Sequence, residues 1–351
     1  MFGLECRVTK SLSRYERRAV ESLLGRSGLV FEGTPDYIAL AEDTEGRLAA
    51  TASLAGSVIK MVAADSQWQE AGLSGIVISA LMRTAGEKGL YHLFIYTKPE
   101  MADRFAGLGF RPLAAAPSAV LMESGAPGIA QYKEKLAAER AKAEKDGAGS
   151  ASAAVMNCNP FTLGHLHLIE EAARGAARLY VIVVEEDASV FPFADRISLV
   201  QRGTAHLPNV CVIGSGSYAV SAATFPTYFL KDRAEPAAAK VQAELDASLF
   251  GLLFVKELGI TRRFVGTEPF CPVTAVYNEA LKASLPSFGC AVTEIERIQA
   301  DGAAISASRV RSMLAGGTEP EALSALLPSV TIDYLKSAKG AEIIKKLREK
   351  K

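Results

Sequence analysis

The sequence predicts an α/β protein with two domains: a C-terminal domain built on a doubly wound, Rossmann-like parallel sheet, and an N-terminal α+β domain. Three observations lead to this prediction. In the C-terminal half, short apolar runs alternate with helical patterns. In the N-terminal half, apolar runs follow one another with few helical patterns among them. A charged, alanine-rich stretch that ends in Gly, Ser and Ala separates the two halves.

The C-terminal half supplies the parallel sheet. The runs that predict strands are, in chain order, AAVMNCN, RLYVIVVEED, NVCVIGSG and RRFVGTE. The helical patterns between them are HLHLIEEAARGA, FADRISLVQRGTAHL and the stretch 243–258. Apolar strands that alternate with helices pair in parallel and are covered on both faces. In such a sheet, ligands bind outside the carboxyl ends of the strands.

The N-terminal half contains the strand-like runs YIALAED, RLAATASLAG, VIKMVAA and YHLFIYT, with the helical pattern GLSGIVISALMRTAGEKG between the last two. The stretch YKEKLAAERAKAEKDGAGSASAA is typical of a helical spacer with a flexible end. We therefore expect domains over residues 1–128 and 153–351, joined by a helical and flexible linker over 129–152.

Composition excludes several classes of function. The 351 residues carry 39 basic and 39 acidic side chains, and a net charge of zero argues against a nucleic-acid partner. Five scattered cysteines without a Cys-x-x-Cys pair fit reduced thiols better than disulfides or a zinc site. The sequence shows no secretory leader and no apolar run of about 20 residues. We expect a cytoplasmic protein with no membrane partner.

The loop after the first C-terminal strand carries the candidate phosphate site. The string VMNCNPFTLGHLHLIEEAA leaves a strand, passes Asn157 and Thr162, and begins a helix near Gly164. The N–H groups and positive dipole end of a helix N-terminus attract anions. We expect Gly164 to let the backbone approach a phosphate, and His165 to donate a hydrogen bond to it. The competing interpretation is a threonine cap followed by a histidine that is satisfied within the protein.

A second polar motif lies far downstream. The string ISASRVRSML places Ser306 and Ser308 at a helix start, with Arg311 three residues after Ser308 on nearly the same face. The serines can cap the helix and donate to phosphate oxygens, and the guanidinium can hold a pyrophosphate. Helix capping alone is the competing interpretation for the serines. Together with the upstream loop, this motif predicts an enzyme that cleaves ATP between its α- and β-phosphates.

Family resemblance sharpens this prediction. Thr-x-Gly-His is similar to the His-x-Gly-His signature of nucleotidyltransferases, and ISASRVR resembles the Ile-Ser-x-Ser-x-x-Arg motif that accompanies it. Between the two motifs, the strings VFPFADR, ATFPTYFLK and RFVGTEPFCPVTAVYN resemble the citrate lyase ligase family. That resemblance covers essentially the whole region after the linker.

The resemblance implies an AMP-forming ligase. Such an enzyme condenses ATP with acetate to give acetyl-AMP and pyrophosphate. It then passes the acetyl group to the thiol of a dephospho-CoA-type arm on the acyl carrier subunit of citrate lyase. We expect Mg²⁺ to bridge phosphate oxygens with few protein ligands, and we predict no metal ligands in the chain.

Specific roles follow for the residues of the two motifs. We assign Thr162 and His165 to the α- and β-phosphates, and Arg311 to the leaving pyrophosphate; these three are the predicted catalytic residues. Arg196 is a further candidate for a phosphate contact, and Gly266 and Thr267 for the ribose or adenine. The full predicted ATP-binding set is Asn157, Asn159, Pro160, Phe161, Thr162, Gly164, His165, Arg196, Gly266, Thr267, Glu268, Ile305, Ser306, Ser308 and Arg311.

The N-terminal domain resembles the GCN5-related acetyltransferase fold. In QWQEAGLSGIVISALM, Gln69, Gly72, Ser74 and Gly75 match or adjoin that fold's pyrophosphate loop, although Ser74 stands where Gly or Ala is usual. In MADRFAGLGFRPL, Ala106 occupies the place of a tyrosine that commonly donates a proton to the leaving thiolate. We expect a domain that holds the arm of the carrier without independent acetyl transfer. A purely structural domain is the alternative.

Three other functions compete with the ligase. An adenylyltransferase of a small phosphorylated acceptor, such as a pantetheine phosphate, would use the same two motifs. A binding module with a degenerate nucleotide site is disfavoured by the intact motif residues. An N-acetyltransferase is weakened by Ser74 and Ala106. The sequence does not indicate the oligomeric state, the choice among short acids, or the role of the basic C-terminal tail.

Overall fold

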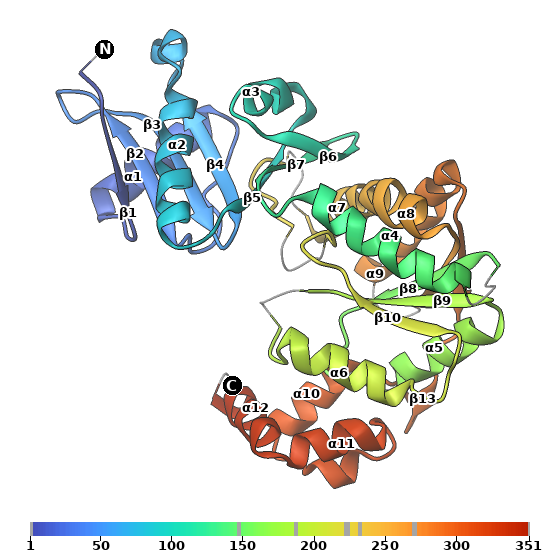
Figure 1. Ribbon diagram of the computed structural model, residues 1–351. Helices are drawn as coiled ribbons and strands as arrows, with labels where there is room; N and C mark the ends of the chain where they lie inside the picture. The colour runs from blue at the N-terminus through green and yellow to red at the C-terminus, as the bar shows by residue number, and fades with distance from the viewer. Residues whose placement is uncertain are drawn as a thin grey trace. The chain divides into compact units, whose positions relative to one another are not determined.

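The computed structural model describes residues 3–145, 149–185, 189–220, 225–230, 234–268 and 272–349 (Figure 1). The chain folds into two compact units. The first contains residues 1–132 together with 225–248, and the second contains 133–224 and 249–351. The chain therefore returns to its first unit after residue 224, which the sequence did not indicate.

The second unit is built on a five-stranded, all-parallel sheet in the order β10-β9-β8-β11-β12. Its strands are β8 (Ala151–Met156), β9 (Arg178–Val183), β10 (Val210–Gly214), β11 (Ile260–Gly266) and β12 (Ala291–Ile295). From central β8 the chain winds to one edge, then returns to β11 and winds to the other edge. The direction reverses between β8 and β11, where ligands of such sheets bind. This arrangement confirms the predicted doubly wound sheet.

Helices cover both faces of this sheet (Figure 1). On one face lie α5 (Leu163–Arg174) and α6 (Phe193–Gly203), and on the other lie α4 (Ile129–Lys145), α8 (Lys256–Leu258) and α9 (Pro272–Ser284). A further helix, α7 (Glu235–Phe250), precedes a π-helical turn over Gly251–Val255. The apolar faces of α5 and α6 bury Ile169, Ala172 and Leu199 in one core with the strands. Burial of these faces fixes where each helix begins, and hence where the strand-end loops lie.

A separate helical layer follows the last strand. It contains α10 (Ala307–Ala315), α11 (Ser329–Lys336) and α12 (Ala338–Glu349), after a short β-hairpin, β13 (Gln299–Ala300) and β14 (Ala303–Ala304). The basic tail forms the amphipathic helix α12, whose Ile343, Ile344 and Leu347 enter a second core. Hydrogen bonds join this layer to the loop after β8 and the start of α5: Leu163 N–H donates to Leu326 O at 2.9 Å, and Thr331 Oγ1 donates to Phe161 O at 2.9 Å.

The first unit is an α+β fold, as predicted. Its described sheet has the order β1-β2-β3-β4-β5-β7-β6 and is antiparallel except between β4 and β5. Its strands are β1 (Glu5–Thr9), β2 (Tyr37–Glu42), β3 (Leu48–Ala55), β4 (Val58–Ala64), β5 (His92–Thr97), β6 (Arg111–Ala116) and β7 (Ala119–Gly125). Its helices are α1 (Arg14–Arg26), α2 (Leu73–Glu87) and α3 (Ala102–Ala106), with 3₁₀ turns at Ser66–Ala71 and Pro99–Met101.

The parallel pair of this first unit separates after two paired positions, Val58–Phe94 and Ile59–Ile95. The segment 225–230 packs beside these strands. Its Tyr228 hydroxyl donates to the Tyr96 carbonyl at 2.8 Å, and both tyrosines are buried. A buried hydroxyl needs such a partner. Through this contact the segment 225–230 belongs to the first unit.

The predicted linker is helical in its first part, since α4 covers Ile129–Lys145. The helix also packs against the second unit. Leu136 is buried, and Lys133 Nζ lies 3.5 Å from Glu257 Oε1. Residues 146–148 of the expected flexible end lie outside the described part. The helical part of the linker, Ile129–Lys145, is therefore a packed element of the fold.

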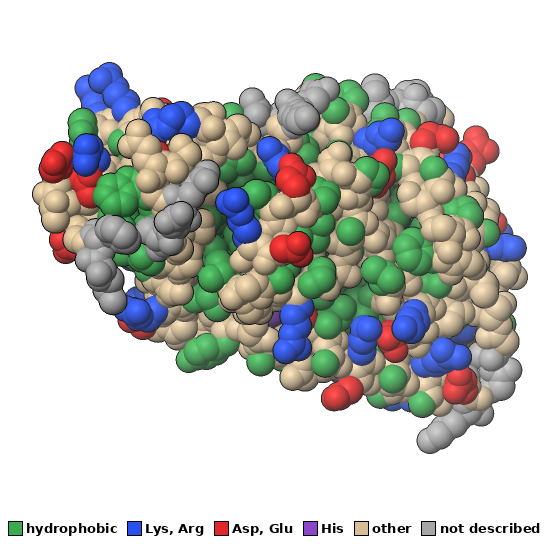
Figure 2. Space-filling model, turned by 90° about the horizontal axis from the view of Figure 1, so that it is seen from above, with side chains coloured by type: hydrophobic (Ala, Val, Ile, Leu, Met, Phe, Trp, Pro, Cys, Tyr) green, Lys and Arg blue, Asp and Glu red, His purple; other side chains and the backbone are tan. Residues whose placement is uncertain are grey.

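The described surface agrees with the balanced composition. On the face drawn in Figure 2, acidic and basic side chains are interspersed among the described residues, without a large patch of one sign. Among the helices that the structure describes, none has the length and apolarity that crossing a membrane requires.

Candidate active site

The loop after β8 forms a closed, internally bonded turn at the reversal point of the parallel sheet. Thr162 is the N-cap of α5, with extended backbone angles, and its Oγ1 accepts from the His165 N–H at 3.4 Å. The Thr162 N–H in turn donates to His165 Nδ1 at 3.1 Å. The two residues therefore form a reciprocal capping box in which histidine takes the place usually held by Glu or Gln.

This capping box fixes the protonation of His165. A backbone N–H can only donate, so Nδ1 must accept, and the single ring proton of the neutral imidazole lies on Nε2. Burial, with a smaller contribution from the charge of Arg297, lowers the pKa of His165 to about 4. The Phe161 ring stacks near His165 at 6.2 Å between centroids. His165 is thus a neutral, oriented N–H donor at pH 7.

The second motif meets this loop directly. Ser306 is the N-cap of α10, and its Oγ accepts from the Arg309 N–H at 3.1 Å. Arg311 Nη1 donates to the Asn159 carbonyl of the β8 loop at 2.5 Å, and its Nη2 donates to Ser308 Oγ at 3.1 Å. Two segments that are 152 residues apart in sequence therefore form one site.

Electrostatics favour an anion beside Arg311. Its guanidinium is partly buried, and burial lowers its pKa from the ordinary value of 12.5. The contacts shown for it are to a carbonyl and a hydroxyl, and within the described residues it has no carboxylate partner. A desolvated guanidinium without a counter-charge gains most from an anionic ligand such as a phosphate.

Gly164 has a packing role that the sequence did not indicate. A Cβ at this position would lie 2.7 Å from the Ile305 carbonyl oxygen and 3.5 Å from Ile305 Cβ. The missing side chain therefore allows the two motifs to pack together, whereas the sequence led us to expect close approach of a phosphate. Ile305 itself is buried and supports the turn from the inside.

Arg196 also differs from its prediction. Its side chain is fully buried, with Nη1 donating to Asn157 O at 2.6 Å and to Val184 O at 2.7 Å, and Nε donating to Phe191 O at 2.9 Å. These bonds tie the loops after β8 and β9 together. In this structure Arg196 holds the loop after β8 in place, and a direct contact with ATP does not fit its burial.

The other predicted residues of this loop are buried or partly buried. Asn157 Oδ1 accepts from Arg196 and Ser189, and Asn159 Oδ1 accepts from the Phe191 N–H at 3.1 Å. Pro160 and Phe161 are buried. The Oδ1 atoms of both asparagines are thus used within the protein.

The loop after β11 carries the last predicted group. Gly266 O accepts from Asn278 Nδ2 at 3.0 Å, and the Thr267 N–H donates to Ile295 O at 2.8 Å. Glu268 Oε2 lies 2.6 Å from Arg297 Nη2. Arg297 was missed by sequence reasoning because it follows a strand in no recognisable motif. The strand that it follows, β12, was not among the predicted strands, so no local signal pointed to it.

The predicted arm-binding residues lie at the start of α2. Gly72 is the N-cap, with φ +61°, and no side chain caps the helix. A Cβ on Gly75 would lie 3.2 Å from Leu108 Cδ2. Ser74 is half-buried on the first turn. The side chain of Gln69 lies outside the described part of the chain.

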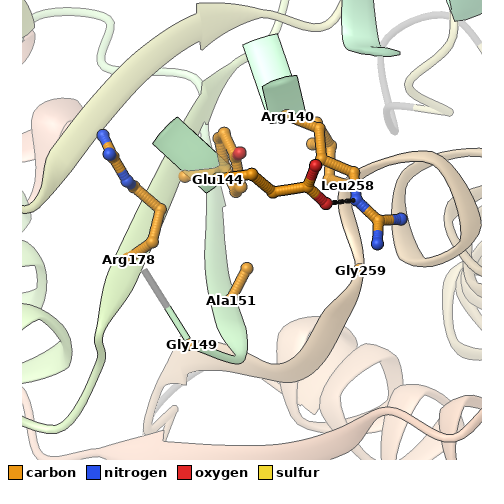
Figure 3. A pocket seen from close by; sticks show the side chains of 8 residues that line it. Arg140, Glu144, Gly149, Ala151, Arg178, Leu258 and Gly259 are labelled. Carbon is orange, nitrogen blue, oxygen red and sulfur yellow. Dashed lines mark hydrogen bonds and ion pairs between the residues drawn. The ribbon is translucent and has the colours of Figure 1, made fainter. Parts of the chain in front are cut away.

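A cavity of about 210 Å³ in the second unit lies away from the two motifs (Figure 3). It is lined by Arg140, Glu144, Gly149, Ala151, Arg178, Tyr180, Leu258 and Gly259. These residues mark the amino ends of β8, β9 and β11, which is the opposite edge from the one where ligands of a parallel sheet bind. The cavity and the candidate site therefore lie at opposite edges of the parallel sheet.

Metal coordination by the protein is not indicated. Across the residues that the structure describes, no cluster of three or more His, Cys, Asp or Glu could hold a metal ion. The four described cysteines, Cys6, Cys158, Cys211 and Cys290, are free thiols. A divalent ion that arrives bound to nucleotide phosphates needs few protein ligands.

The fold and the site together define a nucleotidyltransferase-class α/β domain: a parallel sheet whose reversal point carries a Thr-x-Gly-His turn joined to an Ile-Ser-x-Ser-x-x-Arg helix. Comparison with known proteins gives the family. Residues 151–335 match the family model described as the citrate lyase ligase C-terminal domain. The citrate (pro-3S)-lyase ligase of Klebsiella pneumoniae is 38% identical over 324 residues, which are 91% of this chain and 92% of that protein.

The chain belongs to the citrate lyase ligase family and is a ligase. A phosphopantetheine adenylyltransferase of Methylococcus capsulatus is 37% identical over 67 residues, 18% of this chain and 41% of that protein. Among solved structures, an acyl-CoA N-acyltransferase from Pseudomonas aeruginosa covers 35% of this chain and 99% of its own, at 16% identity and a TM-score of 0.30. That last likeness says nothing about activity.

Proposed function

We propose that this ligase activates acetate with MgATP and transfers the acetyl group to the thiol arm of the citrate lyase acyl carrier subunit. The observation that carries the proposal is the junction of the two motifs, in which Arg311 reaches the carbonyl of Asn159 beside a neutral His165. Sequence identities of 38% and 37% to citrate lyase ligases, over 91% and 96% of this chain, support the same activity.

In the first step, a carboxylate oxygen of acetate attacks the α-phosphorus of ATP. A new P–O bond forms, the bond to the bridging oxygen of the β-phosphate breaks, and pyrophosphate leaves. The Nε2–H of His165 is placed to donate to phosphate oxygens as charge shifts onto them, while Arg311 and Ser308 stabilise the pyrophosphate. Positioning and charge stabilisation supply the catalysis, because the protein forms no covalent bond.

The neutral state of His165 suits this role. A donor whose other ring nitrogen is already bonded to the backbone needs no reorientation when charge develops. Thr162 contributes by holding the ring and by capping α5. In the first turn, Leu163 N–H already donates to Leu326 O and His165 N–H to Thr162 Oγ1, so the Gly164 N–H is the group left to a phosphate oxygen among the described contacts. The ATP is thus held at a helix N-terminus by dipole, imidazole and guanidinium together.

In the second step, the carrier thiol attacks the acyl carbon of acetyl-AMP, AMP leaves, and the thiol proton passes to solvent. The first unit is our proposed holder of the carrier arm, through the α2 start at Gln69, Gly72, Ser74 and Gly75. The free described cysteines and the use of ATP suit a cytoplasmic enzyme. The two units would then serve the two substrates of this step.

Exchange of labelled pyrophosphate into ATP by the full-length protein tests the first step. We expect exchange that requires acetate, since only the reversal of acetyl-AMP formation returns pyrophosphate to ATP. Pyrophosphate exchange that requires phosphopantetheine and does not depend on acetate would show that the same motifs serve an adenylyltransferase.

A further inference from the structure

Arg297 lies at the candidate site but belongs to neither motif. It follows β12, and its backbone N–H donates to Thr267 Oγ1 at 3.3 Å, so it sits over the loop after β11. Because β11 and β12 are parallel, with Gly266 paired to Ile295, both residues lie at the carboxyl edge of the sheet. This is the edge that carries the β8 loop.

Two neighbours fix the direction of its guanidinium. Glu268 Oε2 lies 2.6 Å from Nη2, and a Cβ on Gly266 would lie 3.2 Å from Nε. The Glu268 side chain is 8% exposed, whereas that of Arg297 is 34% exposed. The carboxylate therefore anchors the pair from inside, and the guanidinium extends over Gly266 to the accessible side.

The remaining donors of Arg297 face no described acceptor. Glu268 is the only side-chain partner found for its guanidinium among the described residues, which leaves Nε and Nη1 for a ligand. The positive charge also reaches His165, whose pKa it helps to lower. Arg297 and the phosphate-binding histidine therefore belong to the same electrostatic environment.

The chemistry of the first step requires a cation of this kind. A carboxylate must approach a triphosphate although both are anions, and the repulsion is strongest at the moment of attack. Arg311 contacts the β8 loop and is assigned to the leaving pyrophosphate. Arg297 reaches the site from the β11 side, and its planar fork suits a carboxylate.

We propose that Arg297, oriented by Glu268 and given space by Gly266, forms the subsite that binds the carboxylate of the acid substrate. This inference rests on the proposed acetate activation. A second oxyanion with the same chemistry is the α-phosphate of ATP, so the test must separate the two.

The test measures KM for acetate and KM for ATP in pyrophosphate exchange, in the wild type and in Arg297→Gln and Arg297→Lys. We expect KM for acetate to rise at least about tenfold in Arg297→Gln, with KM for ATP within about twofold of wild type. Arg297→Lys keeps the charge and the pairing with Glu268 but loses the fork, and should show a smaller rise in the same constant. If Arg297→Gln does not fold, the KM values of Arg297→Lys test the proposal.

Two further variants complete the design. Glu268→Gln should raise KM for acetate less than Arg297→Gln does, because it disturbs only the orientation of the Arg297 guanidinium. Arg262→Gln removes a charge from an exposed position earlier on β11 and should change neither constant.

Three results would overturn the proposal: an unchanged KM for acetate in Arg297→Gln, a rise in KM for ATP alone, or an equal rise in both constants. If the wild type shows no acetate-dependent exchange, the proposed function fails and this subsite fails with it. If the wild type exchanges normally and the Arg297 variants match it, only the subsite is refuted.

Discussion

The helices α5 and α2 both carry a predicted phosphate contact at the N-terminus, yet the structure equips them differently. α5 begins at a capped Thr162, presents His165, and receives Arg311 from a distant helix. α2 begins at Gly72 without a side-chain cap, and the Cβ position of Gly75 lies 3.2 Å from Leu108 Cδ2. Several hydrogen-bond donors therefore lie at the start of α5, whereas the start of α2 is a packed turn.

The difference shows what a helix N-terminus can and cannot indicate. Its backbone N–H groups and dipole are present at every helix and favour an anion only modestly. At α5 the loop carries a neutral oriented imidazole, and a guanidinium from a segment far along the chain contacts the same loop. Hydrogen-bond donors from separate segments distinguish the proposed ATP site from an ordinary capped helix.

The largest expected effect comes from removing the donor at α5. His165→Ala should lower acetate-dependent pyrophosphate exchange by about 100-fold or more, the scale for loss of one transition-state donor. The matched control is His167→Ala on the same helix, where Nε2 contacts the Glu296 carbonyl at 3.2 Å. That variant should stay within about threefold of wild type. Equal losses in the two variants would mean that the motif histidine has no special role.

The next effect concerns the contact between the two motifs. Gly164→Ala places a Cβ 2.7 Å from the Ile305 carbonyl oxygen, so we expect it to reduce the free energy of unfolding by about 1–3 kcal/mol. Gly175→Ala, at the C-cap of the same helix, meets no atom within 4 Å and should change it by less than about 0.5 kcal/mol. Denaturant unfolding of both variants decides, and a neutral Gly164→Ala would contradict the packing described here.

A pH-dependent effect follows from the capping box. Unfolded His165 binds a proton near its ordinary pKa of 6.5, whereas the folded pKa is about 4. Between these values the unfolded state holds up to about one more proton, so stability is complete above pH 6.5 and is lost as the pH falls toward 4. Unfolding measured across this range should depend less on pH in His165→Gln. An identical pH dependence in the variant would refute the lowered pKa.

The smallest effect is expected at α2. Ser74→Glu adds a negative charge at the proposed arm-binding turn, so it should leave pyrophosphate exchange within about twofold while raising KM for the carrier protein several-fold. The exchange assay is the internal control, because it does not involve the carrier. An unchanged KM for the carrier would favour the purely structural interpretation of the first unit.

Local patterns predicted much of this molecule. Strand and helix alternation after residue 150 predicted four of the five parallel strands, all except β12, and the two motifs predicted which loops form the candidate site, because each signal lies within a few consecutive residues. The burial of Arg196, the contact of Gly164 with Ile305 and the placement of Arg297 could not be read this way. Each depends on which segments meet in space, and a charged or small residue has the same local pattern in either environment.

The return of residues 225–248 to the first unit was missed for the same reason. The string FPTYFL is an apolar run without period, and only its contacts, such as Tyr228 with Tyr96, reveal where it packs. Tertiary contact overrides local composition at such segments.

The central claim is that the β8 loop and the α10 motif act as one ATP site. The most direct test is a double-mutant cycle on acetate-dependent pyrophosphate exchange with His165→Ala, Arg311→Lys and the double variant. If the two groups act as a unit, removing either one already removes most of their joint effect on the rate. The double variant should therefore be at most about tenfold slower than the worse single variant. If the losses instead multiply in full, the two motifs act independently and the single-site account is wrong.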